Sequence, residues 1–208
     1  MKKSVSFRFC LYCCFVLFLG CATTVNTFPV KTISGETQPI IETQLPKSKQ
    51  TDLGLYITAK EAYEQWKLNP DHIKILDCRT PEEYAFVGHA SMAYNVPGRF
   101  FAYKFDNEKN APVMIDNPDF LKEVNMKFKP DDTIFVMCRS GGRSAESVNI
   151  LAKAGFKNVF NIIDGFEGDT IKDPGSYFDG KRMRNGWKNS GAPWTYKLDI
   201  RLMYLTSE

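Results

Sequence analysis

The sequence predicts an α/β protein built on a mainly parallel β-sheet. Short runs of apolar, strand-forming residues alternate with segments in which apolar residues recur at helical spacing. Helix-length connections separate the strands, and parallel strands need them because the chain must return to the same end of the sheet. Ligands bind such sheets at the carboxyl ends of the strands, so the residues that directly follow each strand are the functional candidates.

Five segments have the composition of short strands. They are residues 55–57, 73–77, 93–96, 133–137 and 159–163. The first helix is expected to begin after Thr58, which forms a capping-box pattern with Glu61, and to end at Asn69-Pro70. The second is expected at Thr80-Pro81, where a hydroxyl cap precedes a proline at the first helical position.

Two further helices follow from the same signals. One is expected to start at Asn117-Pro118, and the other to span 143–154 and end at Gly155. Residues 98–118 are expected to form an irregular loop whose aromatic side chains pack within it, with a place at the mouth of a site as the alternative. Residues 167–185 are interpreted as a flap or an interaction surface.

The most informative stretch is the cysteine loop, residues 138–144, between the strand at 133–137 and the following helix. Its sequence is Cys138-Arg139-Ser140-Gly141-Gly142-Arg143-Ser144. A helix N-terminus offers unpaired N–H groups and a partial positive charge, and glycines let such groups converge on an anion. This setting favours the thiolate form of Cys138, and Arg139 and Arg143 add donors suited to oxyanions. The loop therefore predicts a nucleophilic sulfur that faces an anionic substrate.

Several motifs in a fixed order extend this interpretation to residues 53–196. They are Ile75-Leu76-Asp77-Cys78-Arg79-Thr80-Pro81-Glu82-Glu83-Tyr84, Gly88-His89-Ala90, Ala93-Tyr94-Asn95-Val96-Pro97, the cysteine loop, and Gly186-Trp187-Lys188 with Gly191-Ala192-Pro193-Trp194. Together they resemble the rhodanese-like sulfurtransferases. The resemblance implies a rhodanese-like fold, with a central, mainly parallel five-stranded sheet flanked by helices on both faces.

The resemblance also implies a reaction. Cys138 would attack the sulfane sulfur of a small anionic donor such as thiosulfate, release sulfite and carry a persulfide until a thiol or cyanide acceptor removes the sulfur. The substrate-binding residues would be Arg139, Ser140, Gly141, Gly142, Arg143 and Ser144. No metal or organic cofactor is implied, and with two histidines in the chain a metal site is not expected.

Two other uses of the same loop are open. Cysteine-dependent phosphatases place an arginine after five intervening residues, whereas here Arg143 comes after four and Ser144 holds the phosphatase position. The loop is thus one residue short for clamping phosphate. A non-catalytic or sulfur-relay binding module is the second alternative.

Cys78 departs from the family pattern, in which a small aliphatic residue is usual. It follows the strand at 73–77, as Cys138 follows the strand at 133–137. One interpretation is a packed thiol that replaces an aliphatic side chain. The other is an accessory thiol that forms a disulfide with Cys138, which would make the chain a thiol redox protein. Asp77 and Arg79 are expected to be framework residues.

The first 20 residues have the pattern of an export signal. A basic start with Lys2, Lys3 and Arg8 precedes an apolar stretch, 9–19, that is shorter than the roughly 18–20 residues needed to cross a bilayer. Cys21 follows in a context that resembles a bacterial lipoprotein signal, which implies that Cys21 carries lipid. A plain signal peptide or an uncleaved anchor is the alternative.

The rest of the chain is expected to divide into a flexible tether (22–52), a folded domain (53–198) and a C-terminal tail (199–208). Three of the 27 basic residues lie in the signal, so 24 basic side chains remain against 24 acidic ones. This balance argues against nucleic-acid binding. We expect an exported, periplasmic protein that a lipid anchor holds at the membrane.

Overall fold

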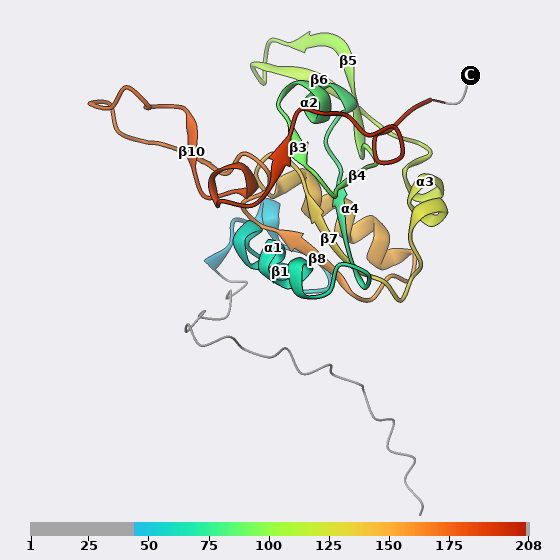
Figure 1. Ribbon diagram of the computed structural model, residues 1–208. Coiled ribbons are helices and arrows are strands. Elements are labelled where there is room, and N and C mark those ends of the chain that lie inside the picture. Colours follow the sequence, from blue (N-terminus) through green and yellow to red (C-terminus); the bar gives the residue numbers. More distant parts are fainter. Residues whose placement is uncertain (1–43, 207–208) are drawn as a thin grey trace, which may run out of the picture. The chain divides into compact units, whose positions relative to one another are not determined.

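The central sheet of the protein is parallel and has five strands (Figure 1). The computed structural model describes residues 44–206. The strand order is β1-β8-β7-β2-β4, with every neighbouring pair parallel. The strands are β1 (Tyr56–Ile57), β2 (Ile73–Asp77), β4 (Tyr94–Asn95), β7 (Thr133–Met137) and β8 (Val159–Ile162). The predicted fold class is confirmed, and each predicted strand lies within a residue or two of its observed bounds.

Four α-helices connect the strands. They are α1 (Ala59–Leu68), α2 (Pro81–Phe86), α3 (Phe120–Lys127) and α4 (Gly142–Lys153). The capping boxes predicted for α1 and α2 are both present. Helix α3 begins later than predicted because Asn117 is held outside it: its amide donates to the Pro97 carbonyl, and its oxygen accepts the Asp119 N–H.

The two faces of the sheet pack against different helices. Alternate strand residues such as Ile75 and Met137 belong to a core cluster with α1 and Trp187, which lies in the 3₁₀ helix η3 (Trp187–Asn189). The intervening residues Cys78, Val136 and Cys138 belong to a second cluster with α3 and α4. Successive strand side chains point to opposite faces, so Cys78 and Cys138 lie on the same face.

Residues 98–118 form a β-hairpin, so the prediction of an irregular loop was wrong. Strand β5 (Arg99–Asp106) pairs antiparallel with β6 (Ala111–Asp116). Its aromatic side chains pack only in part within the segment: the rings of Phe101 and Tyr103 contact each other, but Tyr103 is 80% exposed and Phe105 is also exposed. A ribbon open to solvent on both faces needs no alternation of apolar and polar residues, which is the signal that identifies a half-buried strand.

The folded part of the chain includes residues before 53 and after 198, the bounds predicted for the domain. Residues 44–52, assigned to the tether, include the 3₁₀ helix η2 (Lys47–Lys49); Lys49 Nζ donates to the Ile163 carbonyl at 2.8 Å. The expected tail also docks, because the Asn95 N–H donates to the Leu202 carbonyl at 2.7 Å and Tyr204 contacts the ring of Phe100. The rest of the expected tether, 22–43, and the expected signal, 1–20 with Cys21, lie outside the described residues.

The segment 167–185 forms a second hairpin-like extension. Strand β9 (Asp169–Thr170) pairs antiparallel with β10 (Arg182–Arg184), and the intervening residues project from the domain (Figure 1). Another short antiparallel pair, β3 (His89–Ala90) and β11 (Trp194–Thr195), joins two of the sequence motifs. No helix among residues 44–206 combines the length and apolar character needed to cross a membrane.

Candidate active site

Cys138 lies at the carboxyl end of β7, the middle strand of the sheet, directly before the turn into α4. Its side chain is buried, and two groups of the loop approach the sulfur. The Gly141 N–H donates to Sγ at 3.2 Å, and the Ser144 hydroxyl lies 3.4 Å from Sγ. One backbone N–H of the loop therefore contacts the sulfur.

The conformation of the cysteine loop depends on two glycines, one in the loop and one in the segment after β8. Gly141 has a φ of +97°, and a Cβ there would collide with the Ile163 carbonyl. Gly165, with a φ of +62°, lies behind the loop, where a Cβ would collide with the Cys138 carbonyl. The Phe166 N–H donates to that carbonyl at 2.8 Å. These contacts hold the loop against the segment that follows β8.

Asn161 of β8 fastens the loop from within the sheet. Its buried amide donates to the carbonyls of Gly141 and Lys49, each at 3.0 Å, and its oxygen accepts the Ser144 hydroxyl at 2.6 Å. The Ser144 hydroxyl has one proton and lies closer to the Asn161 oxygen than to Cys138 Sγ. The main hydrogen-bond donor to Sγ is therefore the Gly141 N–H. Sequence reasoning missed Asn161, although an amide in the middle of an apolar strand signals a buried group that needs partners.

Arg143 is not free to bind an anion. Its two terminal nitrogens donate to the two carboxylate oxygens of Glu83, each at 2.6 Å. Burial raises the pKa of the Glu83 carboxyl, but the hydrogen bonds and charge of Arg143 outweigh burial, and the pKa is lowered overall. Glu83 lies in the first turn of α2. The ion pair joins two segments 60 residues apart.

The other loop residues take different positions. Arg139 extends into solvent, and no hydrogen bond or ion pair of its guanidinium is found within residues 44–206. Gly142 starts α4, so its N–H is among those without an intrahelical partner. Ser140 is partly exposed at the turn. Of the predicted binding residues, the structure brings Gly141 and Ser144 to the sulfur and turns Arg143 toward α2.

Asp77 and Arg79 are framework residues, as predicted. Both side chains are buried, and Arg79 donates to both carboxylate oxygens of Asp77 and to the Gly88 carbonyl. The guanidinium also stacks over the ring of Phe166 at 4.1 Å. This pair ties the end of β2 to the segment behind the cysteine loop.

Cys78 lies beside Cys138 on the neighbouring strand. Asp77 and Met137 are register partners, and the Cys78 N–H donates to the Met137 carbonyl at 2.9 Å. Both thiols are buried and free. Burial raises the pKa of the Cys78 thiol, and the charge of Cys138 adds to the rise, while the Ser147 hydroxyl and Arg143 oppose it. Cys78 is therefore a thiol, not a thiolate, at neutral pH.

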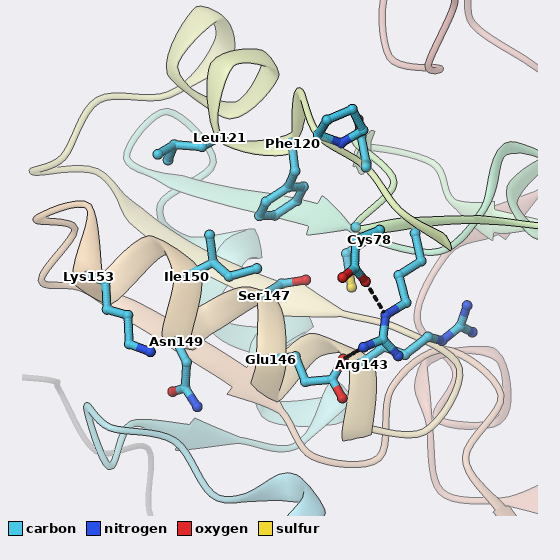
Figure 2. Close-up of a pocket in the computed structure, with 14 residues that line it drawn as sticks. Cys78, Phe120, Leu121, Arg143, Glu146, Ser147, Asn149, Ile150 and Lys153 are labelled. Carbon is cyan, nitrogen blue, oxygen red and sulfur yellow. Dashed lines mark hydrogen bonds and ion pairs between the residues drawn. The ribbon is translucent and has the colours of Figure 1, made fainter. Parts of the chain in front are cut away.

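A cavity of about 420 Å³ reaches Cys78 from the side of α3 and α4. Figure 2 shows Phe120 of α3 on one side of it and Ser147 and Ile150 of α4 on the other. Arg143 also lines this cavity, whereas Cys138 does not. In the described part of the chain, no group of three or more His, Cys, Asp or Glu side chains is arranged to hold a metal ion.

The sequence and the fold of the chain are similar to those of known proteins. The model of the rhodanese-like domain family matches residues 58–171, more than half of the chain. Over 93 residues, 45% of this chain and 70% of the relative, the sequence is 42% identical to "Thiosulfate sulfurtransferase 16, chloroplastic" of Arabidopsis thaliana. It is 34% identical to "Uncharacterized protein RP600" of Rickettsia prowazekii, over 67% of this chain and 96% of that protein. The crystal structure of Rv0390 from M. tuberculosis matches with a TM-score of 0.52 and 26% identity, over 68% of this chain and 96% of that chain.

Proposed function

The chain belongs to the rhodanese-like domain family, and on that premise we propose that it is a sulfurtransferase whose sulfur carrier is Cys138. In the first half-reaction the Cys138 thiolate attacks the sulfane sulfur of a small anionic donor of the thiosulfate type, and sulfite leaves. In the second, a thiol or cyanide acceptor takes the terminal sulfur and regenerates the thiolate. This is covalent catalysis in two halves, so the kinetics are ping-pong.

The observation that carries the proposal is the hydrogen bond that the Gly141 N–H donates to Cys138 Sγ at the start of α4. A sulfur held there faces the unpaired N–H groups of the first helical turn, which favour an anion. Thiolate and persulfide are both anionic, so the loop is suited to both states of the carrier. Arg139, which extends into solvent, is suited to meet the incoming donor.

The positions of Ser144 and Arg143 disfavour phosphate chemistry. Ser144, at the position of the phosphatase arginine, holds its hydroxyl against Asn161 and Cys138. Arg143, the residue before Ser144, is bound by Glu83. A phosphate clamp needs a guanidinium aimed at the substrate oxygens, and neither residue is placed to supply one.

Mass spectrometry of the full-length chain tests the proposal. After incubation with thiosulfate and blocking with an alkylating reagent, the peptide that contains Cys138 should gain one sulfur atom. Cyanide should remove that sulfur as thiocyanate, and Cys138→Ser should abolish both results. A chain that gains no sulfur and gives no thiocyanate would refute the sulfurtransferase and leave a binding module.

We also propose that residues 1–20 direct export and that Cys21 is lipidated, which places the domain in the periplasm at a membrane. The support is the sequence pattern of a basic start, a short apolar stretch and a small residue before the cysteine. In cells grown with radiolabelled palmitate, the wild-type chain should be labelled and found with membranes. Cys21→Ser should lose the label; a labelled Cys21→Ser chain would contradict the assignment.

A further inference from the structure

Cys78 is a second thiol within bonding reach of Cys138. Strands β2 and β7 are in register up to Asp77 and Met137, and each cysteine is the residue directly after its strand. Neighbouring strands lie about 4.8 Å apart. Disulfides form between residues whose Cα atoms are about 4.4–6.8 Å apart. The strand register therefore predicts a Cα separation for Cys78 and Cys138 within the range that a disulfide spans.

The side chains also point the same way. Strand alternation places both cysteines on the α3 and α4 face, and both belong to the apolar cluster on that face. Helix α4 runs past them: Ser144 contacts Cys138, and Ser147, one turn later, lines the same cavity as Cys78. The two thiols thus lie side by side beneath the first two turns of one helix.

We infer that Cys78 is the resolving thiol of this site: it displaces the sulfane sulfur from the Cys138 persulfide as hydrosulfide and leaves a Cys78–Cys138 disulfide. This inference rests on the proposed function, because the persulfide must form first. The Cys78 sulfur attacks Cys138 Sγ, the bond from Sγ to the terminal sulfur breaks, and the proton of the Cys78 thiol leaves with the hydrosulfide. The two thiols are oxidised to the disulfide, and the sulfane sulfur is reduced to sulfide.

The surroundings of Cys78 keep this step slow at neutral pH. The reactive species is the thiolate, and burial together with the charge of Cys138 at the end of β7 raises the pKa of Cys78. Asp77 on the same strand raises it further, whereas Ser147 and Arg143 of α4 lower it, and α3 contributes apolar Phe120. The charge of Arg143 is compensated by Glu83 of α2. If an acceptor arrives soon after loading, it takes the terminal sulfur of the persulfide. If none arrives, Cys78 attacks and the terminal sulfur leaves as hydrosulfide.

The cavity beside Cys78 gives a small thiol access to the Cys78–Cys138 disulfide, which must be reduced before the next cycle. Because Cys78 lines it and Cys138 does not, a small thiol that enters the cavity meets the disulfide at Cys78. Attack there gives a mixed disulfide with Cys78 and frees the Cys138 thiolate for another donor. A second thiol then restores Cys78. The net reaction converts thiosulfate and two thiols into sulfite, sulfide and a disulfide.

The test loads the full-length chain with thiosulfate, removes excess donor and follows the Cys138 peptide over time without added thiol. We expect the wild-type signal for one extra sulfur to decay while a peptide linking Cys78 to Cys138 appears and one hydrosulfide is released per chain. Because the thiolate fraction rises about tenfold per pH unit below the pKa of a thiol, the decay should accelerate about tenfold per unit between pH 7 and 9. Cys78→Val, and Cys78→Ser as a variant with different packing, should keep the extra sulfur and release no hydrosulfide.

Two results separate failure of this inference from failure of the proposed function. If wild type and Cys78→Val both keep the sulfur indefinitely, the sulfurtransferase stands and Cys78 is only a packed thiol. If neither chain takes sulfur from thiosulfate, the proposed function fails for that donor, and inorganic polysulfide is used to load Cys138 instead. Loss of the sulfur without a Cys78–Cys138 peptide in that experiment would overturn the inference.

Discussion

The ion pair between Glu83 and Arg143 should contribute measurably to stability. Each carboxylate oxygen of Glu83 accepts a 2.6 Å hydrogen bond from Arg143, and both side chains are only 23% exposed. Exposed pairs contribute about 0–1 kcal/mol, and breaking a buried pair costs about 3–5 kcal/mol. For this intermediate exposure we expect Glu83→Gln to lower the free energy of unfolding by about 2 kcal/mol.

The chain contains a matched control for this substitution. Glu61 forms the same capping box at the start of α1 that Glu83 forms at the start of α2, and no arginine contact of Glu61 is found in the described residues. Because glutamine can also complete a capping box, Glu61→Gln should report only the loss of the carboxylate charge at the helix N-terminus, about 0.5 kcal/mol. In urea denaturation at pH 7, a 2 kcal/mol loss shifts the midpoint by roughly 1 M, since the slope is about 1–3 kcal/mol per molar.

Equal midpoints for Glu83→Gln and Glu61→Gln would refute the reasoning, because the pair with Arg143 would then contribute nothing beyond a carboxylate charge at a helix N-terminus. A double-mutant cycle with Arg143→Gln measures the coupling directly. The pH dependence gives a separate check. The pKa of Glu83 is lowered from its ordinary 4.5, so the folded chain binds fewer protons there than the unfolded chain. This stabilisation is complete above pH 4.5 and is lost as the pH falls through the lowered value, and Glu83→Gln should remove it.

Three further outcomes follow from the site. Gly141→Ala should lower the free energy of unfolding by more than about 2 kcal/mol and reduce sulfur loading, because Gly141 has a positive φ and the added Cβ would collide with the Ile163 carbonyl. Gly142→Ala is the matched control, since its added Cβ meets no atom closer than 3.7 Å. It should lower the free energy of unfolding by less than about 1 kcal/mol in the same denaturation and loading assays. Asn161→Leu should cost about 2–3 kcal/mol in thermal or urea unfolding and lower the persulfide yield, because the carbonyls of Gly141 and Lys49, one buried and one partly buried, lose their donor; unchanged loading would show that the loop does not depend on this amide. The raised pKa of Cys78 means that the folded chain holds a proton that the unfolded chain loses above about pH 8.5, so wild-type stability should fall as the pH rises from 8 to 10 and Cys78→Val should lose that part of the slope.

Local signals predicted the helices well because their causes lie within a few residues. The capping boxes that start α1 and α2 each involve a hydroxyl and a glutamate three positions apart, and both are present. The start of α3 was misplaced because Asn117 is held by Pro97, 20 residues earlier. The hairpin formed by β5 and β6 escaped prediction because its two exposed faces impose no alternation on the sequence.

The sequence by itself determined the parallel α/β sheet, the placement of Cys138 at a strand end and the glycines that turn the loop. These depend on residue type and on spacing over a few positions, which the chain order contains. Only the tertiary structure decided the partners of the loop. Arg143 is 60 residues from Glu83, and Asn161 reaches both Gly141 and Lys49.

The place of Cys78 required both kinds of information. Its position after β2 is local, but its neighbour depends on which strands pair and in what register. Parallel pairing of Asp77 with Met137 sets Cys78 beside Cys138, and alternation turns both thiols to the same face. Register arises from the packing of whole strands against the helices, so a second sulfur beside the first is a property of the folded sheet and not of either segment alone.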